Sequence, residues 1–212
     1  MLKPTQIIEL RRGPLDAAKI AKIVAVIRTG GVMVYPTDTF YGLGAGAYSE
    51  TAVRKVYSLK KREKGKPLSV VVSGIEMAEK IAAFLPPSFL GLSRAFWPGP
   101  LTLVIKAKPL FPNEMLGPGG SLALRLPDVP WLLELVRRTD IPITATSANI
   151  SGKKEIDSGK EVIEVFKGKV DLIVDGGKTP GGLPSTIVDL TSEKPRVLRE
   201  GAIPSERLRP YL

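Results

Sequence analysis

The sequence predicts a single-domain α/β protein in which a twisted, mixed β-sheet is flanked by helices. Short apolar runs rich in β-branched residues alternate with segments whose apolar residues recur at helical spacing. Several predicted strands follow one another directly, so antiparallel pairs should accompany parallel ones. At 212 residues the chain is long enough for one sizeable core, and it shows no internal repeat. We expect one domain over residues 1–212, with its core at about 16–202.

The first half of the chain gives clear signals for both kinds of element. A helix is expected over Asp16–Thr29, because Ile20, Ile23 and Ile27 share one face, Asp16 is a typical N-cap and two glycines follow. Next come the strand Val32–Tyr35, a helix from about Ser49, the strand Leu68–Val72, the helices Ile75–Phe84 and Ser88–Phe96, and the strand Leu101–Lys106.

The second half begins after a Gly/Pro-rich loop, Pro109–Gly120, and continues as short strands separated by helices and loops. The expected strands are Leu122–Leu126, Ile143–Thr146, Leu172–Val174, Thr186–Leu190 and Val197–Arg199; the expected helices lie near Trp131–Arg137 and Glu161–Phe166. The stretches Ser151–Gly159 and Gly176–Pro184 read as loops inside the domain.

Two residue types that carry much enzyme chemistry are missing, because the chain contains no Cys and no His. A thiol nucleophile, a disulfide, a Ser-His-Asp triad and a zinc site of imidazole or thiolate ligands are therefore excluded. General acid–base work would fall to Asp, Glu, Lys or Tyr. Catalysis by this chain would depend on charge and positioning.

The chain is basic, with 31 Lys and Arg against 21 Asp and Glu and a formal net charge of +10. This charge favours polyanionic partners such as nucleotides or RNA, although a lysine-rich surface also suits proteins of hot environments. The short clusters are Lys60–Lys64 and Arg196–Arg199. No apolar run approaches the roughly 18 residues of a membrane helix, and the start lacks the apolar stretch of a signal peptide, so we expect a cytoplasmic protein without a membrane partner.

The glycine-rich segment Tyr41–Gly46 superficially resembles a dinucleotide fingerprint, but no helix opens at its third glycine. Glycines in a strand allow a ligand or a neighbouring part of the sheet to come close, and the tight sheet crossing is the favoured interpretation.

Two polar segments are candidates for ligand binding. Lys60, Lys61, Arg62, Lys64 and Lys66 follow a helix, where they could gather around phosphates or form an ordinary solvated surface. The segment 144–152 opens an apolar strand into Thr, Ser and Asn side chains at the strand end, the usual ligand position in α/β sheets. A polar turn capped by its own side chains is the alternative.

Two arginines occupy strands predicted to be largely buried. Arg125 lies inside the apolar run Leu122–Leu126, and Arg199 ends another strand. A buried guanidinium requires an anion, which could be a ligand carboxylate or phosphate, or an internal acidic side chain. The sequence leaves both alternatives open for each arginine.

Taken together, a series of motifs resembles the YrdC-like domain family, whose best-understood members are threonylcarbamoyl-AMP synthases. The resemblance spans nearly the whole chain and includes the family's Lys-x-Arg and Ser-x-Asn signatures. The motifs lie at Gly31–Thr39 with Tyr41–Gly44, Lys60–Arg62 with Lys66–Leu68, Trp97–Thr102, Ala123–Asp128, Ser147–Gly152, Pro184–Asp189 and Val197–Gly201.

The resemblance implies a basic concave face on which ATP, L-threonine and bicarbonate meet. Threonine would be carboxylated on its amine, and the carbamate would attack the α-phosphorus of ATP to give threonylcarbamoyl-AMP and pyrophosphate. Mg²⁺ would be held mainly by the ATP phosphates, with no metal ligand from the protein. A transferase complex would pass the threonylcarbamoyl group to tRNA, and direct contact with tRNA or double-stranded RNA is a further expectation.

The resemblance also assigns site residues. Those implied for ATP are Lys60, Arg62, Lys66, Ser121, Ser147, Asn149 and Arg199. Those implied for L-threonine are Thr39, Arg125 and Ser185, with Arg125 on the carboxylate.

At a few positions the chain differs from the family it resembles, and two other functions are alternatives. Glu63 replaces a proline of many relatives, Val71 replaces a histidine of some, and the chain ends at Leu212, so a short single-domain synthase is expected. The rivals are a non-catalytic module that binds double-stranded RNA and a YrdC-like carbamoyl-transfer paralogue. The intact signatures oppose the first, and the absence of Cys opposes the second, because carbamoyl-transfer relatives carry zinc fingers.

Overall fold

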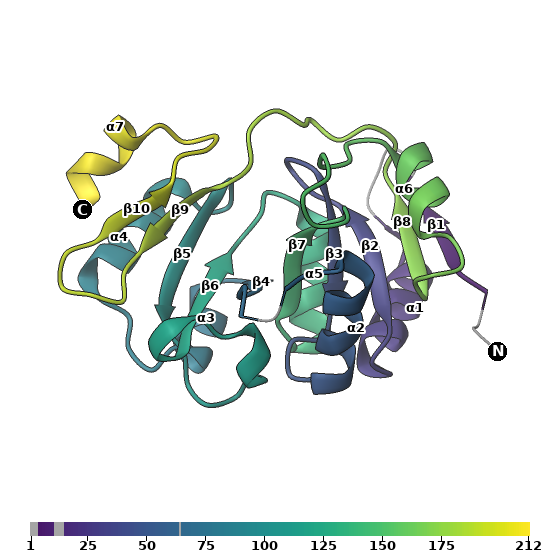
Figure 1. Cartoon of the computed structure of the whole chain (residues 1–212), viewed down its shortest axis with the longest axis horizontal. Helices are drawn as coiled ribbons and strands as arrows, with labels where there is room; N and C mark the ends of the chain where they lie inside the picture. Colours follow the sequence, from purple (N-terminus) through teal and green to yellow (C-terminus); the bar gives the residue numbers. More distant parts are fainter. Residues whose placement is uncertain (1–3, 11–14, 64) are drawn as a thin grey trace.

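A ten-stranded mixed sheet organises the computed structural model, which describes residues 4–10, 15–63 and 65–212 (Figure 1). The strands are β1 (Gln6–Glu9), β2 (Val32–Pro36), β3 (Tyr41–Ala45), β4 (Ser69–Val71), β5 (Leu101–Lys106), β6 (Ser121–Arg125), β7 (Ile143–Ser147), β8 (Leu172–Asp175), β9 (Thr186–Asp189) and β10 (Arg196–Arg199). The α-helices are α1 (Ala17–Arg28), α2 (Glu50–Lys60), α3 (Ile75–Ile81), α4 (Pro87–Phe96), α5 (Pro130–Thr139), α6 (Gly159–Phe166) and α7 (Ser205–Leu208).

The strand order in the sheet is β1-β8-β2-β3-β7-β4-β6-β5-β9-β10. The pairs β1–β8, β8–β2, β4–β6 and β5–β9 are parallel, and the remaining neighbours are antiparallel. In Figure 1 the N-terminal strand lies at one end of the sheet and the C-terminal hairpin of β9 and β10 at the other. The predicted mixed sheet is confirmed.

Helix α1 forms as its sequence pattern predicts. The side chain of Asp16 accepts a hydrogen bond from the Lys19 N–H, which satisfies one of the free donors at the helix start. Ile20, Ile23 and Ile27 are buried along one face, which packs against β2, and α1 also packs against α5. Helix α1 therefore buries its apolar stripe against strand β2.

The glycines of β3 make room for a buried tyrosine on the neighbouring strand. A Cβ at Gly42 would lie 2.8 Å from the Tyr35 ring, and one at Gly44 would lie 2.5 Å from the same ring. Tyr35 is fully buried and its hydroxyl donates to the Thr144 carbonyl oxygen at 3.1 Å. The glycines thus serve close sheet packing, as the favoured interpretation of this segment held.

Several details differ from the sequence-based expectations. The helix expected over Ile75–Phe84 ends at Ile81, because Ala82 turns extended and bridges Ala107. Strand β1 and helix α7 were not predicted, and both lie outside residues 16–202. The burial predicted for the strand at Val197–Arg199 is wrong, since β10 is an edge strand whose residues are mostly exposed.

None of the helices in the described part of the chain combines the length and apolar character that a bilayer crossing requires.

Candidate active site

A pocket of about 730 Å³ lies over one face of the sheet, and its floor is built from strand residues at alternating positions. Val71 pairs with Arg125, Arg125 with Thr102, and Thr102 with Ile187, so their side chains form a row across β4, β6, β5 and β9. Arg199 of β10 pairs with Ile187 and extends this row. All five residues line the pocket.

A second row of floor residues runs parallel to the first and is made mostly of small side chains. Ala145 pairs with Ser69, Ser69 with Ala123, Ala123 with Val104, and Val104 with Asp189. These five residues also line the pocket. Small side chains here leave depth above the sheet, so a bound molecule would lie against the strands themselves.

The pocket brings together most of the site residues that the sequence predicts. Eight of the ten line its wall: Thr39, Arg62, Lys66, Ser121, Arg125, Ser147, Ser185 and Arg199. The other two, Lys60 and Asn149, are buried behind Ser147.

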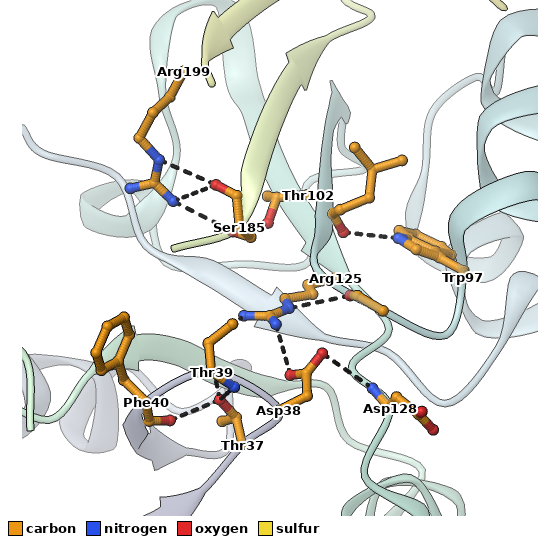
Figure 2. A network of polar contacts seen from close by, with 12 residues as sticks. Thr37, Asp38, Thr39, Phe40, Trp97, Thr102, Arg125, Asp128, Ser185 and Arg199 are labelled. Carbon is orange, nitrogen blue, oxygen red and sulfur yellow. Dashed lines mark hydrogen bonds and ion pairs between the residues drawn. The ribbon is translucent and has the colours of Figure 1, made fainter. Parts of the chain in front are cut away.

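Arg125 is held in place by acceptors on three sides (Figure 2). Its Nη2 donates to Asp38 Oδ1 at 2.6 Å, and longer contacts run from Nε to the Gly99 oxygen at 3.4 Å and from Nη1 to Thr39 Oγ1 at 3.5 Å. The Arg125 and Asp38 side chains are only 12% and 14% exposed. The internal ion pair is therefore present, and it fixes a guanidinium at the pocket wall.

Thr39 reaches the pocket because the loop after β2 is folded by its own hydroxyls. Thr37 Oγ1 donates to the Phe40 oxygen at 2.6 Å and accepts from the Thr39 N–H at 3.1 Å. This arrangement is an ordinary hydroxyl-stabilised turn. It brings the Thr39 hydroxyl and the carboxylate of Asp38 up to Arg125, as Figure 2 shows.

Arg199 and Ser185 form a second polar group on the opposite wall. Arg199 Nε and Nη2 donate to the Ser185 main-chain oxygen at 3.1 and 2.7 Å, and the Ser185 and Thr102 hydroxyls lie 2.8 Å apart. Partial burial lowers the pKa of the Arg199 guanidinium, which nevertheless remains charged at neutral pH. Its anchor is a main-chain oxygen rather than an acidic side chain.

Arg62 and Lys66 belong to the loop that leaves α2. Lys61 adopts a left-handed conformation, with φ 48°, and ends the helix, so that Arg62 turns toward the pocket. Arg62 donates to the main-chain oxygens of Lys66 at 3.2 Å and Pro67 at 3.0 Å, while Lys66 pairs with Glu63 at 2.8 Å on the exposed side. Lys64 of the predicted cluster lies outside the described residues.

Sequence reasoning did not single out several residues that line or support the pocket. Thr102, Glu155 and Asp189 line it, and Asp38 pairs with Arg125 behind its wall. The alternation of side chains along a strand could have identified some of them, since Thr102 and Val104 face the pocket while Leu103 faces the core. The sequence does not show which strands are neighbours, and this pairing decides which strand residues lie together on the pocket floor.

Comparisons with known proteins agree with the fold. Residues 25–201 match the Sua5/YciO/YrdC family model, described as "Telomere recombination". The chain is 39% identical to a threonylcarbamoyl-AMP synthase of Pyrococcus abyssi over 197 residues, which are 93% of this chain and 58% of that protein. It is 39% identical to a putative threonylcarbamoyl-AMP synthase of Methanocaldococcus jannaschii over 182 residues, 86% of this chain and 85% of that protein.

Among solved structures, the chain is similar to P. abyssi Sua5 complexed with L-threonine, with a TM-score of 0.92 and 38% identity over 98% of this chain and 61% of that chain. The chain thus spans less than two thirds of the length of the P. abyssi relative.

Proposed function

The chain belongs to the Sua5/YciO/YrdC family, and from this membership we propose that it is a threonylcarbamoyl-AMP synthase. It would condense L-threonine, bicarbonate and ATP to threonylcarbamoyl-AMP and pyrophosphate. The observation that carries the proposal is the single pocket lined both by the residues implied for the nucleotide and by those implied for threonine. Two substrates that react with each other must meet in one pocket.

For the nucleotide, we propose that Arg62, Lys66 and Arg199 bind the phosphates, with the hydroxyls of Ser147 and Ser121 beside them. The support is that all five line the pocket and that the guanidinium groups of Arg62 and Arg199 can bind phosphate oxygens in a bidentate manner. These cations would stabilise the charge that develops on the phosphoryl group in the transition state. Lys60 and Asn149 were predicted as direct nucleotide contacts, but their positions behind Ser147 suit an indirect role.

For threonine, we propose that Arg125 binds the carboxylate, with Thr39 and Ser185 nearby. Arg125 Nη2 already donates to Asp38, so a carboxylate would approach the Nη1 side, where the contact found among the described residues is the long one to Thr39 Oγ1. The ion pair would hold the guanidinium in one orientation before the substrate arrives. Val71, in the position of a histidine of some relatives, lies beside Arg125 and adds no hydrogen bond of its own.

In the proposed reaction, the threonine amine attacks the carbon of bicarbonate, and loss of water leaves a carbamate. A carbamate oxygen then forms a bond to the α-phosphorus while the bond from that phosphorus to the β-bridging oxygen breaks, and pyrophosphate departs. The protein would contribute alignment of the carbamate with the phosphorus and cations around the phosphates. No step requires a thiol or an imidazole.

Mg²⁺ would enter bound to ATP. The cationic side chains of the pocket wall are Arg62, Lys66, Arg125, Arg196 and Arg199, and its carboxylates are Glu155 and Asp189. Such a donor set suits phosphate oxygens better than a bare divalent cation, so we propose that the phosphates hold the metal, whose charge would assist the departure of pyrophosphate.

The wider setting follows from the same proposal. We propose that the product is passed to a tRNA-modifying transferase complex in the cytoplasm and that residues 1–212 act as one YrdC-like domain. The net charge of +10 favours an additional contact with tRNA or double-stranded RNA. A module that only binds RNA is the alternative, but it would not need a pocket of about 730 Å³ lined with both sets of residues.

The direct test measures pyrophosphate release with each substrate omitted in turn. We expect release to require ATP, L-threonine and bicarbonate together, and the labile adenylate to appear in equal amount. Replacing L-threonine with L-alanine is the control for non-specific hydrolysis of ATP. Equal release without threonine would overturn the proposal, and release driven by carbamoyl phosphate would favour the carbamoyl-transfer alternative.

A further inference from the structure

Lys60 is a charged side chain that lies almost completely inside the protein. It is the last residue of α2, only 2% of it is exposed, and it does not line the pocket. Its Nζ donates to three oxygens of one loop: the Ser147 main-chain oxygen at 2.5 Å, the Asn149 main-chain oxygen at 2.9 Å and Asn149 Oδ1 at 2.8 Å. The three acceptors belong to the last residue of strand β7 and to the loop that follows it.

The same loop is tied to Lys60 by its main chain as well. The Ser151 N–H donates to the Lys60 oxygen at 2.8 Å. Within the loop, Ser147 Oγ donates to Asn149 Oδ1 at 2.7 Å, and Asn149 Nδ2 donates to the Lys153 oxygen at 2.5 Å. The segment 147–153 is therefore folded around Lys60, and Asn149 Oδ1 joins the lysine to the Ser147 hydroxyl.

The chemistry of the cluster suits an ammonium group. A protonated lysine has three N–H donors and no acceptor, and three oxygens surround it here. Burial lowers the pKa of Lys60 to about 8, so the amine is still mostly protonated at neutral pH. Without this side chain the main-chain oxygens of Ser147 and Asn149 would lose their lysine donor, and Asn149 Oδ1 would keep only the Ser147 hydroxyl, so the loop would have to move.

From this geometry we propose that Lys60 is a positioning residue, which holds segment 147–153 so that the Ser147 hydroxyl faces the pocket, and that it does not touch the nucleotide. The two members of the Lys-x-Arg signature then have different tasks. Arg62 lines the pocket and supplies the charge, whereas Lys60 supplies the shape of the loop opposite. The part of this proposal that concerns ATP rests on the proposed function.

A double-mutant cycle on ATP binding separates positioning from direct contact. Lys60→Met keeps the length of the side chain and removes its donors, and Ser147→Ala removes the hydroxyl that Lys60 is proposed to place. We expect each single variant to weaken ATP binding in calorimetry by about tenfold, and the double variant to be no weaker than the worse single variant within about threefold. Effects that multiply would show that Lys60 acts on the nucleotide independently, which would overturn the proposal.

The matched control is Lys61→Met, which removes the same charge at the neighbouring, exposed position and should leave ATP affinity unchanged within about twofold. Equal losses of ATP affinity in Lys60→Met and Lys61→Met would show that only the net charge of the protein matters, which would contradict the proposal. Should Lys60→Met fail to fold, Lys60→Gln takes its place; its amide retains two donors, so its loss of ATP affinity should be smaller and should still not multiply with that of Ser147→Ala.

A measurement without nucleotide tests the positioning role of Lys60 independently of the proposed function. Amide NMR of the unliganded protein should show changed chemical shifts and faster hydrogen exchange for residues 147–153 in Lys60→Met, and wild-type values there in Lys61→Met. An unchanged loop in a folded Lys60→Met variant would overturn the positioning role. Absence of ATP binding in the wild type would instead count against the proposed function alone.

Discussion

The two ends of the pocket present their cations in different ways. At one end, Arg125 is mostly buried, paired with Asp38 at 2.6 Å and fixed from three sides. At the other end, Arg62 and Lys66 lie on a loop, where their partners are main-chain oxygens and the exposed carboxylate of Glu63. We call the first the rigid end and the second the adaptable end; under the proposed function, the rigid end would suit one small, oriented ligand and the adaptable end a larger polyanion.

This contrast has an energetic counterpart. A buried ion pair is coupled to folding, because removal of one partner leaves the other charge without compensation in a medium of low polarity. A cation on an exposed loop contributes little to folding but acts at full strength on a ligand that excludes water from around it. Substitutions at the two ends should therefore affect stability and activity in different proportions.

The largest effect is expected at the rigid end. Arg125→Ala should lower the free energy of unfolding by at most about 3–5 kcal/mol, because the mostly buried Asp38 carboxylate is left without its ion-pair partner. Urea titration measures this loss. The double variant Asp38→Ala with Arg125→Ala should lose clearly less free energy of unfolding than the two single variants lose together. Additive losses would mean that the two side chains do not stabilise each other.

At the adaptable end, activity should change without stability. Arg62→Ala should raise the activation free energy of adenylate formation by about 2.7–4 kcal/mol, because a hydrogen-bond donor to the charged phosphoryl group is lost. Its free energy of unfolding should stay within about 0.5 kcal/mol of the wild type. Steady-state kinetics and urea titration on the same preparation provide the test, and a fully active variant would remove Arg62 from the phosphate site.

The buried lysine behind the adaptable end should make stability depend on pH. Since the pKa of Lys60 is about 8 in the folded protein, against 10.5 for an ordinary lysine, the unfolded chain binds more protons between these values. The cost of burying the charged amine is then present at pH 7 and is relieved as the pH rises. Wild type should gain stability relative to Lys60→Met between pH 7 and pH 10 by urea unfolding, and a constant difference would contradict the lowered pKa.

The smallest effect is expected from the exposed partner of Lys66. Glu63→Gln should leave the unfolding transition unchanged, because both side chains are mostly exposed, at 59% and 75%. Release of Lys66 from this pair should raise ATP affinity by less than about fivefold at low salt, and the gain should vanish at high salt. A gain that persists at high salt would show that Glu63 acts on the nucleotide through direct contact.

The sequence predicted more of the fold than of the pocket's construction. Strand β5 begins and ends where its apolar run predicts, and α1 is capped by Asp16 as expected, because both signals are local. Strand β1 was missed, since it has four residues and only one of them, Ile8, is buried. Its pairing with β8, far along the chain, is what makes it a strand.

The site shows the same division between local and long-range information. The sequence indicated that Arg125 needs an anion but not that Asp38, on a distant loop, is its partner. It placed Arg199 in a buried strand, because strand order in the sheet cannot be read locally and β10 is in fact an edge. Lys60 and Asn149 were grouped with pocket residues by motif, while their burial depends on how segment 147–153 folds around α2.

The contrast between the two ends is tested most directly by crossed titrations of the two ligands into folded variants. Calorimetry should show that Arg125→Ala lowers the affinity for L-threonine by a factor at least about tenfold larger than the factor for ATP. Arg62→Ala should lower the affinity for ATP more than the affinity for L-threonine. Unfolding curves recorded on the same samples ensure that only folded protein is compared. Equal losses of both ligands in both variants, or no loss in either, would contradict a pocket with a rigid carboxylate end and an adaptable phosphate end.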